Sequence, residues 1–188
     1  MSVEESWEKI ERWIAQHAPE ESQLPGPCTR ENLERLYQRL GVRLPEDVER
    51  SLLQHDGSGL TDVLLGYTLL GIEDIIKHYE TWLRYANPDD ANLSATDVPY
   101  LVPVAEIGVL KMMVDTRTGG LGTGDIEQGY FQEKNPLYAS LSIVLDFVGN
   151  LLASPPPWIV PLSAGGELEA TNRHPDFPGT LVWTEDFI

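Results

Sequence analysis

Cysteine is almost absent from this chain of 188 residues, because Cys28 is the only one. A single thiol excludes an internal disulfide framework and a zinc site built on cysteines. Histidine is scarce too: His17, His55, His78 and His174 are the four present, and none stands at metal-ligand spacing from another ligand residue. We therefore expect neither a metal nor any other cofactor.

Long apolar runs are also missing. No stretch approaches the ~20 consecutive apolar residues that a membrane-spanning helix needs. At the N-terminus, Glu4, Glu5 and Glu8 stand where a secretory signal would carry basic residues, and no apolar segment follows them. A single thiol is compatible with a reducing compartment. We expect a protein that stays in the cytoplasm and does not partner a membrane.

Basic residues are few, since 13 Lys and Arg face 30 Asp and Glu and give a net charge of −17. The stretch 85–110 contains no basic residue, yet it carries Asp89, Asp90, Asp97 and Glu106. Such a charge distribution repels nucleic acid and anionic lipid, and it steers a basic protein partner toward the chain. A general role of the acids in solubility is the alternative, and both interpretations stay open.

The spacing of the apolar residues, which form 41% of the chain, predicts helices first and strands later. Helical spacing covers the segments Val3–Gln16, Thr29–Gly41, Pro45–Gln54, Ile72–Leu83 and Ser140–Leu152. Extended structure is expected in Val63–Leu70, Tyr100–Val104, Leu110–Val114 and Ile126–Phe131, where Pro99 and Pro103 indicate an edge or a strand end. This order predicts an α+β fold with a mostly antiparallel sheet, N-terminal helices and a closing C-terminal helix.

The last part of the chain differs in kind. Residues 1–152 have the pattern of one domain, whereas residues 153–188 contain three successive prolines, a Gly-Gly pair and few helical signals. The aromatic side chains of this segment are too apolar for a free tail; they are Trp158, Phe177, Trp183 and Phe187. We expect the segment to lie in extended form against the domain.

A glycine-rich stretch runs from Gly119 to Asp125. Asp125 stands three residues after Gly122, where a dinucleotide-binding turn has a glycine, and its carboxylate would repel a pyrophosphate. The lysine of a phosphate-binding loop is also missing. A calcium-binding turn normally comes in several copies, and only one is present. We therefore expect this stretch to be a flexible hairpin connection.

His55 and Asp56 are the only neighbouring pair that resembles acid–base machinery. No Gly-x-Ser-x-Gly motif is present, and Cys28 lies in a proline-rich turn without a nearby histidine. We interpret His55 as the residue that ends a helix, where it interacts with the negative end of the dipole, and Asp56 as a cap of the following turn. A hydrolase centred on His55 and Asp56 is the competing interpretation.

Several short motifs stand in a characteristic order, and together they resemble the SUKH superfamily, in particular its branch named for fungal cell-wall-assembly regulators. The motifs are an N-terminal tryptophan helix, Leu24-Pro25-Gly26-Pro27, Leu40-Gly41, Leu44-Pro45-Glu46-Asp47, His55-Asp56-Gly57-Ser58-Gly59, Leu69-Leu70-Gly71-Ile72, Leu101-Val102-Pro103-Val104 and Val114-Asp115. The resemblance covers about residues 1–152. It departs from the family at Asp56-Gly57-Ser58, where relatives usually have an asparagine and two glycines; Asp replaces Asn readily in a turn.

The resemblance implies an α+β fold without a known active site. In bacteria it implies immunity proteins that bind and block toxins, many of them nucleases, and in fungi it implies regulatory scaffolds. We expect no enzyme, and our leading hypothesis is a bacterial immunity protein that neutralises a basic toxin domain through an acidic surface. A regulatory interaction protein without a toxin is the alternative. The carboxylates expected to bind the partner are Asp62, Asp89, Asp90, Asp97, Asp125 and Glu127.

Overall fold

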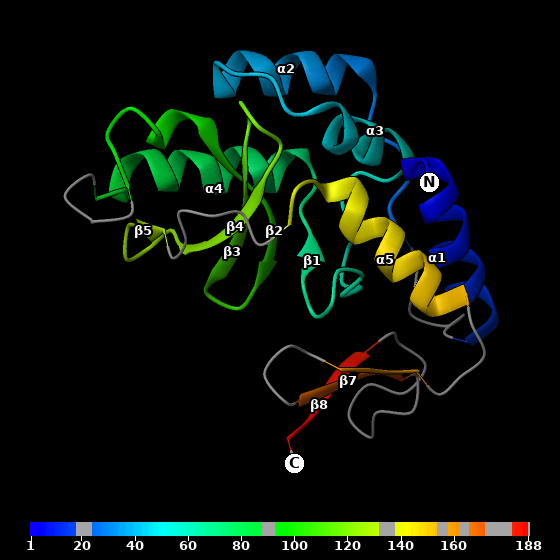
Figure 1. Cartoon of the computed structure of the whole chain (residues 1–188). Coiled ribbons are helices and arrows are strands. Elements are labelled where there is room, and N and C mark those ends of the chain that lie inside the picture. Colours follow the sequence, from blue (N-terminus) through cyan, green and yellow to red (C-terminus); the bar gives the residue numbers. More distant parts are fainter. Residues whose placement is uncertain are drawn as a thin grey trace.

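The computed structural model describes residues 1–17, 24–87, 93–131, 138–153, 158–161, 166–171 and 182–187 (Figure 1). Its helices are α1 (Val3–His17), α2 (Arg30–Leu40), α3 (Glu46–Gln54), α4 (Ile72–Tyr85), the 3-10 helix η1 (Val98–Tyr100) and α5 (Leu141–Ala153). Its strands are β1 (Thr68–Leu69), β2 (Leu101–Ile107), β3 (Leu110–Asp115), β4 (Leu121–Asp125), β5 (Tyr130–Phe131), β6 (Trp158–Pro161), β7 (Gly166–Thr171) and β8 (Val182–Phe187).

One antiparallel sheet of five strands organises the fold, in the order β1-β2-β3-β4-β5. Its register places Thr68, Glu106, Lys111 and Gly124 in one row across the sheet. That row lies next to the turn that joins β2 to β3. The arrangement confirms the α+β class and the antiparallel sheet expected from the sequence.

The helices form two groups around this sheet (Figure 1). Helix α4 packs against β2 and against α2, while α1 packs against α5 and α3. Most of the apolar residues at helical spacing are buried, and Trp7, Tyr79 and Trp82 are among the largest fully buried side chains. Leu83, at the end of the fourth predicted helix, is 47% exposed instead. Burying apolar area of this kind supplies most of the driving force for folding.

Helix α2 illustrates why the boundaries were visible in the sequence. The Thr29 hydroxyl accepts the Asn32 backbone N–H at 3.1 Å and so caps the first turn. At the other end, Gly41 adopts the left-handed conformation with φ of 70°, and its N–H donates to the Tyr37 carbonyl at 2.9 Å. Thr29 and Gly41 are the two ends of the segment predicted from helical spacing, and the structure shows both as the caps of α2.

The glycine-rich stretch is not a flexible connection, and that prediction is wrong. Residues Leu121–Asp125 form the buried strand β4, which pairs with β3 on one side and with β5 on the other. Residues of low strand propensity are tolerated here because backbone pairing on both sides holds the strand. The strand expected at Ile126–Phe131 shrinks to β5, and a turn precedes it in which Gly129 has φ of 72°.

Strand β2 also differs from its prediction. It is not an edge strand, because it lies between β1 and β3. β1 pairs only with Ala105 and Glu106 of β2, so Pro103 has no partner on the β1 side. A bulge follows the proline: the β2–β3 register shifts between Pro103 and Ala105 and leaves out Val104, while Pro103 itself stays opposite Met113.

The C-terminal segment contains a second antiparallel sheet, in the order β6-β7-β8. The domain boundary near residue 152 and the packing of this segment on the domain stay predictions. In the part of the chain that the structure describes, no helix is both long and apolar enough to cross a membrane.

Candidate functional site

His55 joins three parts of the fold. It is the C-cap residue of α3, as predicted, and its N–H donates to the Ser51 carbonyl. Its Nδ1 lies 2.6 Å from the Pro25 carbonyl oxygen, and its Nε2 lies 2.7 Å from a carboxylate oxygen of Glu11. The ring centroid is 4.6 Å from that of Trp7. Both ring nitrogens therefore have partners within the chain, and those contacts tie α3 to α1 and to the turn before α2.

Asp56 caps a helix that begins sixteen residues later in the chain. Its Oδ1 accepts the backbone N–H of Ile72 at 2.8 Å, so the carboxylate lies at the positive end of α4. The prediction placed the cap on the turn that directly follows. The tertiary fold brings the start of α4 there instead, which sequence spacing alone does not show.

Gly57 and Ser58 add further contacts to those of His55 and Asp56, and we call the four residues the His55–Ser58 brace. Gly57 has φ of 81°, and a Cβ added to it would lie 2.5 Å from the backbone nitrogen of Gly71. The buried Ser58 hydroxyl donates to the Thr61 carbonyl at 2.6 Å and accepts the Leu69 N–H at 2.9 Å. The motif from His55 to Ser58 therefore fastens the end of α3 to β1 and to the start of α4.

The space beside this motif is small. A cavity lined by His55, Gly57 and Ser51, among others, has a volume of about 10 Å³, which is room for about one water molecule. The buried Cys28 lies near this cavity in the fold, because its N–H donates to the carbonyl of Leu52, which also lines the cavity. Burial, followed by the charge of Asp56, raises the pKa of Cys28 to about 11, so the thiol is protonated at neutral pH and is a poor nucleophile.

Three of the predicted partner-binding carboxylates lie at the same end of the sheet. Asp62 accepts a hydrogen bond from the Thr68 hydroxyl at 2.6 Å, and Thr68 pairs with Glu106 at the end of β2. Asp125 pairs with Leu110 at the start of β3. Its Oδ1 accepts the backbone N–H of Glu127 at 2.9 Å, which places the exposed Glu127 in the adjoining turn. We call this end of the sheet, with Asp62, Asp125 and Glu127, the acidic sheet end.

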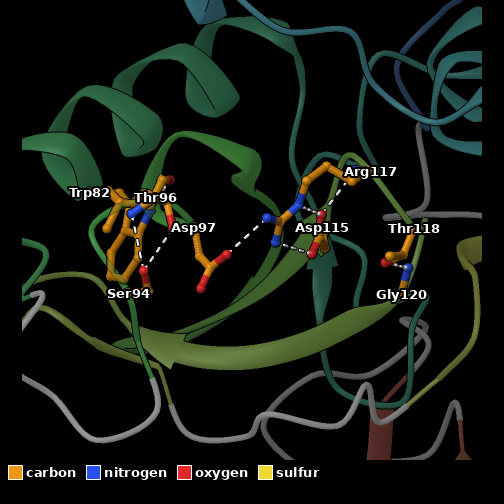
Figure 2. Close-up of polar contacts among 9 residues, drawn as sticks. Trp82, Ser94, Thr96, Asp97, Asp115, Arg117, Thr118 and Gly120 are labelled. Atoms are coloured by element: carbon orange, nitrogen blue, oxygen red, sulfur yellow. Dashed lines mark hydrogen bonds and ion pairs between the residues drawn. The ribbon is translucent and has the colours of Figure 1, made fainter.

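Asp97 lies at the opposite end of the sheet, where Arg117 binds it (Figure 2). Arg117 contacts Asp97 at 2.8 Å and Asp115 at 2.6 Å, and it lies 4.8 Å from the centre of the Tyr100 ring. The guanidinium holds the pKa of the Asp115 carboxyl below its ordinary value, chiefly through their hydrogen bonds. Asp97 thus shares the charge of Arg117 with Asp115 within the chain. Asp89 and Asp90 lie outside the described residues.

A buried ion cluster under the acidic sheet end escaped sequence analysis. Lys111, with a side chain 7% exposed, contacts a Glu106 carboxylate oxygen at 3.0 Å, and His78 Nε2 lies 3.3 Å from the same oxygen. Burial, and next the charge of Lys111, hold the pKa of His78 below its ordinary value of 6.5. A lysine inside an otherwise apolar strand was the available signal, because lysine is almost never buried without a partner.

A known family covers most of this framework. The sequence model of the SMI1 / KNR4 family (SUKH-1) matches residues 27–146, which is more than half of the chain. The chain belongs to the SMI1/KNR4 family. The match includes the His55–Ser58 brace and all five strands of the first sheet, and it confirms the resemblance seen in the motifs.

Named relatives come from fungi. A glucan synthesis regulatory protein of Neurospora crassa is 39% identical over 85 residues, which are 43% of this chain and 16% of that protein. A cell wall biosynthesis and cell cycle regulator of Schizosaccharomyces pombe is 39% identical over 157 residues, which are 80% of this chain and 28% of that protein. A cell wall assembly regulator of Saccharomyces cerevisiae is 25% identical over 89 residues, 43% of this chain and 18% of that protein. The chain thus spans less than a third of each of these relatives.

These names bear on the two hypotheses that the resemblance left open. All three relatives are named as regulators, and none is named as an immunity protein or a toxin partner. They favour the regulatory alternative over the bacterial immunity hypothesis, and nothing in these comparisons supports a toxin.

Proposed function

We propose that this protein is a regulatory protein-interaction module of the SMI1/KNR4 type. The observation that carries the proposal is the family match over residues 27–146, together with a regulator from Schizosaccharomyces pombe that resembles 80% of the chain. Because the chain covers 28% of that regulator, the module corresponds to one part of a larger regulatory protein in that organism.

A role without catalysis fits the way the chain uses its reactive side chains. His55, Asp56 and Ser58 each bind the chain itself, at 2.6–2.9 Å from groups of other elements. Catalysis would need such groups to face a bound substrate. The role of these residues in holding α3, β1 and α4 together accounts for their presence.

The partner that best fits the chain is a basic protein. With a net charge of −17, the chain attracts positively charged proteins and repels nucleic acid and anionic membranes. The acidic sheet end offers Asp62 and the exposed Glu127, whereas Asp125 there is buried and binds the backbone of its own turn. Asp89, Asp90 and Asp97 stay in the proposal as acids outside this end, of which Asp97 is paired with Arg117. The single thiol is compatible with a cytoplasmic setting, which we include in the proposal.

Affinity capture with a salt gradient tests this function. The full chain is immobilised, exposed to lysate of its source organism, and eluted with rising salt before mass spectrometry. We expect a basic, non-toxin protein that elutes as the salt is raised, because screening weakens contacts between exposed charges. Capture of a toxin domain would restore the immunity hypothesis. Retention of no protein above a charge-matched acidic control protein would contradict the proposal.

A variant separates interaction from catalysis. His55→Ala removes the imidazole on which the hydrolase interpretation depends, and far-UV circular dichroism checks that the variant still folds. The captured proteins should be the same as for the wild type. If the wild type hydrolysed the captured protein or its ligand and His55→Ala did not, the interaction-only account would be wrong.

A further inference from the structure

The tip of the β2–β3 hairpin is apolar and faces solvent. Ile107 is 44% exposed and Val109 is 60% exposed, with Gly108 between them at φ of 54°. Hairpin tips are usually polar, because they lie in water and gain nothing from apolar side chains. Two exposed β-branched residues at such a tip therefore do not stabilise the fold, and they indicate a role in binding.

The chain holds this tip in place from beneath. The Lys111 ammonium donates to the carbonyl oxygen of Gly108 at 2.9 Å, inside the turn itself, while it also binds Glu106. His78 of α4 approaches the same carboxylate. Taking a lysine out of water costs free energy, which its partners must offset. The chain bears this desolvation cost at a surface turn, and the result is that the turn is fixed. A fixed turn loses little conformational entropy when it binds a partner.

A second turn, which contains Leu65 and Gly66, flanks the tip. A Cβ added to Gly66 would lie 3.4 Å from Cδ1 of Ile107, so the turn before β1 touches the hairpin. Leu65 in that turn has φ of 53°, a conformation that residues other than glycine rarely adopt. The segment leading into the turn carries Leu60, which is 99% exposed, and Asp62, which binds Thr68 at 2.6 Å.

Carboxylates surround these apolar residues. The neighbouring turns carry the half-buried Asp62 and the exposed Glu127. Glu106 is paired with Lys111, and Asp125 is buried, so these two acids contribute less to the rim. An apolar centre within a charged rim is the usual anatomy of a protein-binding surface. Because two such acidic rims would repel each other, the surface suits a basic partner better than a second copy of this chain.

We propose that Ile107 and Val109 form the apolar centre of a docking surface, which we call the hairpin-tip surface, and that Asp62 and Glu127 form its rim. Its occupant is a protein segment that presents an apolar side chain flanked by lysine or arginine. This inference rests on the proposed function and names the surface and the partner class through which it operates. Apolar contacts at the centre supply the affinity, whereas the rim steers the approach.

The test compares two pairs of substitutions that change no charge. Ile107→Ser with Val109→Ser removes the apolar tip. Ile143→Ser with Phe147→Ser is the matched control, because these residues of α5 are 52% and 43% exposed and belong to another surface. Each protein is used as the full chain, its fold is checked by thermal unfolding, and its affinity for the protein captured by the wild type is measured with purified components. Hydrogen exchange on the wild-type complex maps the contact independently of any substitution.

We expect the tip variant to bind at least about tenfold more weakly, as for substitution of a central interface residue, and the control to bind like the wild type. Amides of residues 60–66 and 107–111 should gain protection in the complex. Equal binding by the tip variant, with protection elsewhere, would overturn the docking surface and leave the proposed function intact. Failure of the wild type to retain any protein would overturn both.

Discussion

At the scale of single residues, the account makes its clearest demand on Gly57. Its φ of 81° and the 2.5 Å approach of Gly71 to an added Cβ leave no room for a side chain. Gly57→Ala should lower the free energy of unfolding by about 2–4 kcal/mol, because it combines backbone strain with a clash between main chains. Urea unfolding measures this. Gly26→Ala is the matched control, since nothing lies within 4 Å of its added Cβ, and it should change stability little.

His78 gives a prediction for pH. Since its pKa in the folded protein lies below the ordinary 6.5, the unfolded chain takes up the proton first as the pH falls. The contribution of His78 to the free energy of unfolding is therefore fully present above about pH 6.5, and it is lost as the pH falls from there toward the pKa of His78 in the folded protein. Lys111→Met removes the second largest cause of the low pKa, so the pKa of His78 should rise. Titration of the His78 ring by NMR checks this, and an unchanged or lower pKa would contradict the ion cluster.

At the scale of elements, caps should matter more than surface ion pairs. Thr29 caps α2 through a backbone N–H, and Thr29→Ala should cost about 1 kcal/mol. Arg35 of α2 pairs with Glu73 of α4, but the two side chains are 51% and 72% exposed, so Arg35→Gln should cost at most about 0.5 kcal/mol. Denaturant unfolding of both variants compares them. A larger loss for Arg35→Gln would show that the α2–α4 contact depends on charge.

The same scale shows what sequence patterns reveal and what they miss. Apolar spacing, Thr29 and Gly41 gave the five α-helices and the caps of α2, because those signals are local. Strand β4 was not predicted, because its pairing with β3 and β5 stabilises it and its own glycines do not favour a strand. The reach of Asp56 to Ile72 was equally invisible, since it depends on how the chain folds back.

At the scale of the whole molecule, the site was only partly predictable. Counting acids identified Asp62, Asp125 and Glu127, which the register then brought to one end of the sheet. The count also selected Asp97, whose charge Arg117 balances at the other end. Exposed apolar residues such as Val109 were not singled out, because a valine in a strand pattern looks like core until the hairpin turn is located.

The charge of the whole chain predicts how binding responds to its rim. Glu127→Gln removes an exposed carboxylate beside the hairpin tip and should slow association with the basic partner, mainly at low salt, by about twofold to fivefold. Its dissociation rate should change less. Stopped-flow or surface-based kinetics on the purified pair measure both rates. Glu31→Gln, an exposed acid on α2, is the control and should have a smaller effect.

The most direct test of the central claim is the dissociation constant of the captured partner, measured for the wild type and for the Ile107→Ser, Val109→Ser variant over a range of salt concentrations. The account predicts that wild-type binding weakens steadily as salt rises, and that the variant binds at least about tenfold more weakly at every salt concentration. A dissociation constant that changes neither with salt nor with the Ile107→Ser, Val109→Ser substitutions would contradict the account. In that case the protein would not be an acidic interaction module that docks its partner through the hairpin-tip surface.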